Sequence, residues 1–192
     1  MSETTPTVNS DAETAISRSP LEAAVVAYLD ELGWNYERRP SKTGDKVSLI
    51  THVNLDTARV RYCLDIVPSR HGFGIFAYAP FDIPESRRHE VMLYSTRINH
   101  RIYLSKIEMD LEDGELQVVS TAIVEDAELS QAMIGIMMRN VHSVMDTYLP
   151  GILAIIHGQR TADEAWRAVL AGEVTDDVHQ ELDESSPIED AH

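Results

Sequence analysis

The sequence contains a single cysteine, Cys63, among 192 residues. This scarcity excludes an intrachain disulfide and any metal site built from several cysteines. No stretch approaches the roughly 18 consecutive apolar residues of a membrane-spanning helix. Residues 1–19 also lack the positively charged start and the apolar stretch of a secretory signal. We therefore expect a protein of the reducing cytoplasm.

Basic residues are scarce as well. The chain has 16 Lys and Arg against 32 Asp and Glu, a formal net charge of −16. The electric field of this negative charge repels phosphate backbones, which counts against a general nucleic-acid binder. The net charge does not exclude a local basic patch. Arg59 and Arg61 project to the same face of a predicted strand, but that face carries no interleaved aromatic residues of the kind found in single-strand binders. We expect these arginines to pair with carboxylates.

The motifs that carry catalysis are missing: the chain has no G-x-S-x-G elbow, P-loop or kinase signature. Residues 72–77 (GFGIFA) match the letters of a dinucleotide-binding fingerprint, but its glycines must follow a strand and open a helix. Here they open an apolar strand that stops before Pro80. Cys63 has no neighbouring base in sequence and acts as a nucleophile only if the fold brings a histidine close. We predict no enzyme, no catalytic residue and no cofactor.

Metal-ligand patterns are equally sparse. The eight histidines form no H-E-x-x-H or comparable pair. Four acidic residues flank one turn, but the calcium-binding loop pattern with its terminal glutamate is absent: Asp110, Glu112, Asp113 and Glu115. We interpret this cluster as a solvated hairpin tip and predict no metal site.

The two ends of the chain differ in composition from its middle. Residues 1–18 are rich in Thr, Ser, Glu and Asp, and residues 172–192 carry eight acidic residues with no Lys or Arg. Segments with so few apolar residues cannot offset the entropy of ordering. We predict disorder at both ends and a single domain over residues 19–171.

Hydrophobic periodicity divides this domain into helices and strands. Ser19, Pro20 and Glu22 predict the start of a helix that ends near Gly33, and alternation then predicts four strands up to Ala79. After these strands, the sequence predicts a helix over 84–99, a hairpin around 112–114 and a long helix over 129–157 with a break or kink at Pro150. A short helix begins at Thr161. Strands adjacent in sequence predict an α+β fold, an antiparallel sheet flanked by helices, in the order α-β-β-β-β-α-β-β-α-α.

Two surfaces are candidates for binding a partner. The long helix has an apolar stripe wider than a core-facing helix needs, which suits either plain core packing or a dimer or ligand groove. Its methionines are Met133, Met137, Met138 and Met145. On the fourth strand, Phe76 and Tyr78 lie on the face opposite to Phe73, Ile75 and Ala77. Either the chain's own helices cover both faces, or the aromatic face awaits a partner.

Several short motifs, in this order and spacing, resemble the YbjN family, whose members are labelled bacterial sensory transduction regulators. The resemblance covers residues 20–171. Its motifs are 28–36 (YLDELGWNY), 83–85 (IPE), 97–99 (RIN), 111–116 (LEDGEL), 148–150 (YLP), Gly158 and 164–165 (EA).

The resemblance implies a fold similar to class I type III secretion chaperones, which commonly form homodimers and hold an extended client segment against apolar patches. It implies a dimer region in the helix over 84–99 and the following strand, with Val91, Tyr94, Ile98 and Ile102 at the interface. No catalytic residue is established for the family, so none is carried over. An extra strand and a last helix depart from the simplest chaperone pattern.

We therefore expect a non-enzymatic chaperone-like or regulatory protein, a homodimer that binds a protein partner through apolar sheet or helix surfaces. The expected partner-binding residues are Phe76, Tyr78, Met133, Met137, Met138 and Met145. The alternative is a small-molecule sensor or enzyme with a pocket between the sheet and the methionine-rich helix. A nucleic-acid regulator, which the family label suggests, ranks third.

Overall fold

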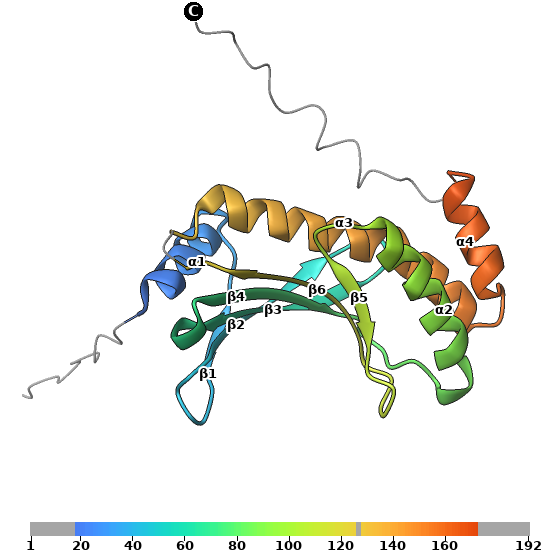
Figure 1. Ribbon diagram of the computed structural model, residues 1–192, viewed down its shortest axis with the longest axis horizontal. Coiled ribbons are helices and arrows are strands. Elements are labelled where there is room, and N and C mark those ends of the chain that lie inside the picture. The colour runs from blue at the N-terminus through green and yellow to red at the C-terminus, as the bar shows by residue number, and fades with distance from the viewer. Residues whose placement is uncertain (1–17, 126–127, 173–192) are drawn as a thin grey trace, which may run out of the picture.

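A computed structural model describes residues 18–125 and 128–172 (Figure 1). The predicted α+β class and the predicted order of elements are both confirmed. The ends predicted to be disordered, 1–18 and 172–192, lie almost wholly outside the described residues. The elements are α1 (Pro20–Glu31), β1 (Glu37–Pro40), β2 (Val47–Asn54), β3 (Arg59–Val67), the 3-10 turn η1 (Pro68–Arg70), β4 (Gly72–Tyr78), α2 (Glu85–Arg101), β5 (Lys106–Met109), β6 (Leu116–Ile123), α3 (Gln131–Ile156) and α4 (Ala162–Leu170).

The strands form one six-stranded sheet in the order β1-β2-β3-β4-β6-β5, and every neighbouring pair is antiparallel. The first four strands follow one another as hairpins, which suits the short polar connections between them. Helix α2 then leads the chain to the far edge of the sheet, where β5 lies. β6 returns from that edge and pairs with β5 on one side and with β4 on the other.

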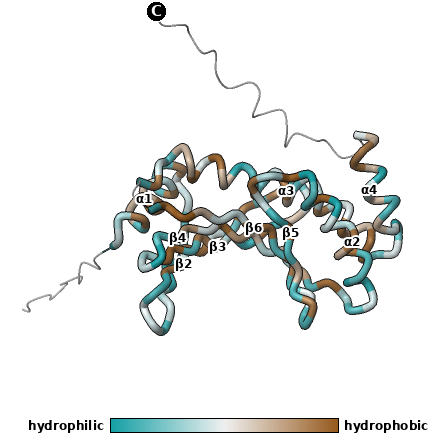
Figure 2. The backbone as a smooth tube through the Cα atoms, viewed as in Figure 1, coloured by the Kyte–Doolittle hydropathy of each residue, from teal (hydrophilic) through white to brown (hydrophobic). Residues whose placement is uncertain are grey.

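The helices lie on one side of the sheet and leave its other face uncovered (Figure 1). Helix α3 packs on β4 and β6, α1 on β3, and α2 on β5. The central strands carry the hydrophobic residues, whereas the turn between β1 and β2 is hydrophilic (Figure 2). The strands bury the following residues against the helices: Val47, Leu49, Val60, Tyr62, Leu64, Ile66, Phe73, Ile75, Ala77, Ile107, Leu116 and Val118.

Helix α3 is the centre of the helical layer, because it contacts α1, α2 and α4 as well as the sheet. Its coverage on several sides explains the wide apolar stripe in its sequence. A break or a kink was predicted at Pro150; the helix continues through this exposed residue, which excludes the break, and the kink stays a prediction. Beside it, Gly151 lets α2 approach closely, since a Cβ at that position would overlap the Tyr94 hydroxyl. None of the helices within residues 18–125 and 128–172 combines the length and apolarity that a membrane crossing requires.

Candidate partner-binding surface

The uncovered face of the sheet carries a strip of apolar side chains at its centre. The strand register places one residue of each strand in a single row, in the order Glu37, Ile50, Cys63, Phe76, Val119 and Lys106. Ile50, Cys63 and Phe76 are half-buried, and Val119 is 8% exposed although it lies outside the core between sheet and helices. We call these four central residues the apolar strip. A charged residue stands at each end of the row.

Phe76 lies flat against the sheet because Gly74 leaves room for its ring. A Cβ at Gly74 would come within 2.8 Å of Cε2 of Phe76. The glycines at 72–77 therefore belong to a strand and not to a phosphate-binding turn, as the sequence predicted. The role of Gly74 is to accommodate an aromatic ring within the strand.

Tyr78 extends the apolar strip toward one end of the strands. It is half-buried, and the Arg61 guanidinium lies 4.3 Å from the centroid of its ring. Burial raises the pKa of the Tyr78 hydroxyl to about 12. Arg61 also lies 3.5 Å from a carboxylate oxygen of Glu115, a contact between two half-exposed side chains that adds little stability. The expected pairing of this arginine with a carboxylate is confirmed.

Cys63 lies in the middle of the apolar strip, between Ile50 on β2 and Phe76 on β4. Its two cross-strand neighbours are therefore apolar, and neither is the histidine that nucleophilic catalysis would require. Burial raises the pKa of the Cys63 thiol above its ordinary value. This favours the protonated, unreactive form at neutral pH.

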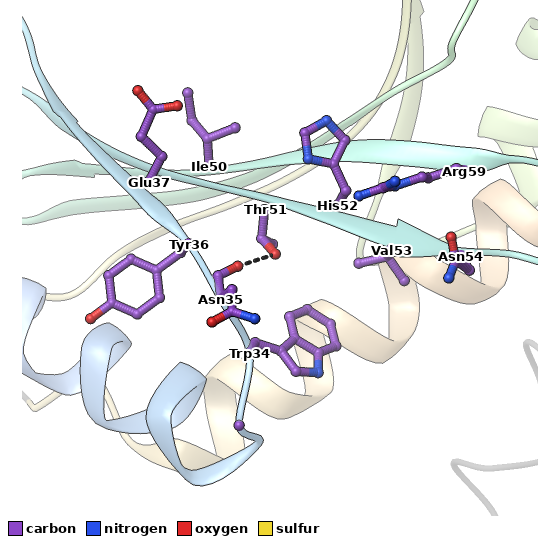
Figure 3. Close-up of a pocket in the computed structure, with 11 residues that line it drawn as sticks. Trp34, Asn35, Tyr36, Glu37, Ile50, Thr51, His52, Val53, Asn54 and Arg59 are labelled. Carbon is purple, nitrogen blue, oxygen red and sulfur yellow. Dashed lines mark hydrogen bonds between the residues drawn. The ribbon is translucent and has the colours of Figure 1, made fainter.

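A groove of about 690 Å³ adjoins the apolar strip at the β1–β2 edge of the sheet (Figure 3). It lies between the segment that leads into β1 and the second half of β2, and it also reaches Arg59 at the start of β3. The Thr51 hydroxyl donates to the Asn35 carbonyl at 2.8 Å and ties the two walls together. The lining residues are 33–37, 50–54 and Arg59.

A second groove of about 960 Å³ lies elsewhere, between the first half of α1 and the segment that leads into α3, next to Pro68 and His71. Neither groove lies between the sheet and α3, where the alternative hypothesis placed a ligand pocket. Three methionines of α3 belong to the core: Met137, Met138 and Met145 are 6%, 5% and 1% exposed, and Met133 is half-buried against it. The structure therefore places Met137, Met138 and Met145 in the core rather than on a surface that a partner can reach.

The residues expected at a dimer interface also face inward. Val91, Tyr94 and Ile98 are fully buried and Ile102 is 4% exposed, all within the core of one subunit. They point inward because they recur at helical spacing on the side of α2 that meets α3 and the sheet. An interface on α2 would use its outward side chains instead, and the homodimer itself stays a prediction.

The acidic turn at 110–115 uses its carboxylates locally. Asp110 accepts from the Glu112 amide at 2.7 Å, and Asp113 accepts from the Glu115 amide at 2.9 Å. Within residues 18–125 and 128–172, no three His, Cys, Asp or Glu side chains are placed to hold a metal ion.

A family model described as "YbjN: Putative bacterial sensory transduction regulator" matches residues 22–154. The chain belongs to the YbjN family. The match spans α1 to most of α3, so the YbjN region contains the whole sheet and the uncovered face, whereas α4 lies beyond it. No curated protein and no solved structure matches the chain.

Sequence reasoning found Phe76 and Tyr78 but missed the groove. Trp34, His52 and Arg59 line it, and they come from three separate segments. The sequence analysis did not relate His52 to Arg59. Only the register of the two strands, which pairs Asn54 with Arg59, brings them beside each other.

Proposed function

We propose that this YbjN-family protein is a non-enzymatic regulator that works in the cytoplasm by binding a segment of a protein partner on the uncovered face of its sheet. The observation that carries the proposal is the apolar strip, Ile50, Cys63, Phe76 and Val119, on a face that none of the helices among the described residues covers.

The chemistry of this face fits a binding surface. In an antiparallel sheet with one face in water, the outward residues are normally polar. Here the outward centre is apolar, while Glu37 and Lys106 stand at the ends of the row. An apolar centre with a polar rim is the anatomy of a protein interface. Phe76, already held flat by its fit over Gly74, would lose little side-chain entropy on binding.

The regulatory label of the family supports the proposal in its general form. A regulator needs a surface through which it reports to another molecule, and the apolar strip lies inside the segment that the family model matches. The partner-binding role of Phe76 and Tyr78 is thus proposed on their position, whereas the methionines of α3 contribute through the stability of the core.

Cross-linking in the native cell tests the proposal. A photoreactive phenylalanine analogue replaces Phe76 in one version of the protein and Ile136, an exposed residue on the helical side, in the other. We expect a discrete protein adduct from position 76 and none of the same mass from position 136.

Substitution then tests whether the adduct reflects binding. Phe76→Asp, or the milder Phe76→Thr, should reduce recovery of that partner by about tenfold, and Ile136→Asp should leave it unchanged. Circular dichroism and urea unfolding verify that each variant folds. Equal recovery with folded Phe76→Asp and wild-type protein would contradict the proposal.

A further inference from the structure

The two edges of the sheet differ in how their outward backbone groups are covered. At the β5 edge, the Asn99 amide of α2 donates to the Ile107 carbonyl at 2.8 Å, and the Ile107 amide donates to Asn99 Oδ1 at 2.8 Å. One side chain thus satisfies both outward backbone groups of a central residue of this four-residue strand. Such a cover prevents the pairing of a further strand at this edge.

The opposite edge is only half covered. β1 pairs with Val47–Ile50 of β2, and within the described residues no strand pairs with residues 51–54 on the side away from β3. The groove of about 690 Å³ lies at this uncovered half (Figure 3). An extended polypeptide can use such an edge, because its backbone completes the ladder while its side chains alternate between the two faces.

The two sides of the groove have different chemistry. Trp34, Tyr36 and Val53 pack against the margin of the core and make the helix-facing side apolar. The opposite side carries His52 and Arg59, whose side chains lie together in Figure 3. A strand added here would place every second side chain against apolar surface and the others against these basic groups.

Arg59 has no acidic partner among the described residues, so the expected pairing of this arginine with a carboxylate is wrong. Arg38 binds Glu22 at 2.6 Å, Arg39 binds Glu37 at 2.7 Å, and Lys46 binds Asp65 at 2.8 Å. Among the described residues, no carboxylate lies within 4.0 Å of the Arg59 guanidinium. In a chain with 32 acidic and 16 basic residues, an exposed arginine at a groove is available to a carboxylate from outside.

We infer that the groove binds an extended segment of a partner protein in which acidic residues alternate with apolar ones, added as a strand beside the second half of β2. The acidic side chains meet Arg59 and His52, and the apolar ones meet Trp34 and Val53. The inference rests on the proposed function and names the chemistry of the segment that the protein would bind.

Trp34 provides a direct signal for the test. The chain has two tryptophans, and the other, Trp166, lies on α4 beside Arg101. In full-length protein carrying Trp166→Phe, fluorescence therefore reports on the groove alone. The probe is the blocked peptide Ac-Glu-Val-Glu-Val-Glu-Val-amide. Its two controls are the same peptide with Gln for Glu, and a version with alternate backbone amides N-methylated.

We expect the acidic peptide to change the Trp34 emission with saturation, and both control peptides to bind at least about tenfold more weakly. Arg59→Glu should weaken the binding of the acidic peptide by about tenfold or more. Arg70→Glu, which reverses an exposed arginine beyond the other end of β3, should not. Equal binding of the Glu and Gln peptides, or no change in emission up to about 1 mM peptide, would overturn the inference.

Cross-linking at position 76 separates this inference from the proposed function. A partner that is captured at position 76 equally well by wild-type and Arg59→Glu protein overturns the acidic segment and leaves the binding face intact. Loss of that partner with Arg59→Glu, but not with Arg70→Glu, supports both the proposed binding face and the inferred acidic segment.

Discussion

At the scale of single residues, Gly74 and Phe76 show how one side chain depends on the absence of another. The Phe76 ring occupies the space above Gly74, so any larger residue at position 74 would lift the ring from the sheet. Alternation in the sequence assigned Phe76 to the face opposite Ile75, and this is confirmed. The contact with Gly74 was not predicted, because it depends on the side-chain conformation and not on the strand pattern.

Cys63 provides a prediction at this scale. Its raised pKa means that less thiolate exists at a given pH than for a free cysteine, and the thiolate is the species that alkylating reagents attack. We expect iodoacetamide to modify folded Cys63 slowly at pH 7.5, and the rate to keep rising beyond the pH at which a free thiol has levelled off. Intact-mass spectrometry over time measures the rate.

Urea-unfolded protein serves as the control for this reaction, since it restores the ordinary pKa. Alkylation of the folded protein as fast as that of the unfolded chain at pH 7.5 would show that Cys63 is not half-buried between Ile50 and Phe76 as described.

At the scale of elements, local signals in the sequence located the helices well. Ser19 accepts a hydrogen bond from the Glu22 amide at 3.1 Å, and Thr161 forms a complete capping box with Glu164. At the start of α1 only half of such a capping box forms, because the Glu22 carboxylate binds Arg38 of β1 instead of the Ser19 backbone. A tertiary contact thus replaced the local one that the spacing predicted.

The strand ends were less predictable. Trp34 and Tyr36 alternate with polar residues as strand residues do, yet they belong to the segment before β1, whose residues Glu37–Pro40 pair with β2. β5 begins only at Lys106, and Tyr103 before it is 89% exposed. Alternation alone cannot show where a strand stops pairing, since that depends on its neighbour.

The contact between Glu22 and Arg38 should decide how firmly β1 is held against α1. The Glu22 side chain is 3% exposed and binds two nitrogens of Arg38 at 2.6 and 3.2 Å. Glu22→Gln removes the charge and leaves Arg38 partly buried without it, so we expect a loss of about 2 kcal/mol in the free energy of unfolding. Urea denaturation measures the loss, and hydrogen exchange should accelerate in residues 37–40.

Glu37→Gln is the matched control. It removes a carboxylate paired with Arg39, but both side chains are 61% exposed, so stability should not change measurably. Equal effects of the two substitutions would mean that the Glu22 contact does not hold the edge strand.

At the scale of the whole molecule, the sheet has a helical side, an open face and two unlike edges. The apolar strip and the groove adjoin each other, because Ile50 lies in the strip and also lines the groove. Asn99 covers the edge at β5. A further strand is therefore left the opposite edge, formed by β1 and the second half of β2.

Asn99→Ala should therefore change how the molecules associate. The substitution removes two hydrogen bonds and exposes the outward backbone groups of Ile107. We expect a loss of about 1–3 kcal/mol in the free energy of unfolding. We also expect self-association that increases with concentration, beyond that of the unchanged protein. Sedimentation velocity over a range of concentrations measures the second effect.

His100→Ala alters the neighbouring exposed residue of α2 and should change neither quantity. If Asn99→Ala destabilises the protein without any change in its association, the amide supports the fold but does not protect the edge.

The sequence by itself determined the α+β class, the order of the elements and the alternation that puts Phe76 and Tyr78 on one face, because these follow from local periodicity and capping. Tertiary structure decided the rest. It buried Met137, Met138 and Met145 of α3, because α3 lies between the other helices and the sheet. It also brought Trp34, His52 and Arg59 together at one edge, because strand register joins residues that no local pattern relates.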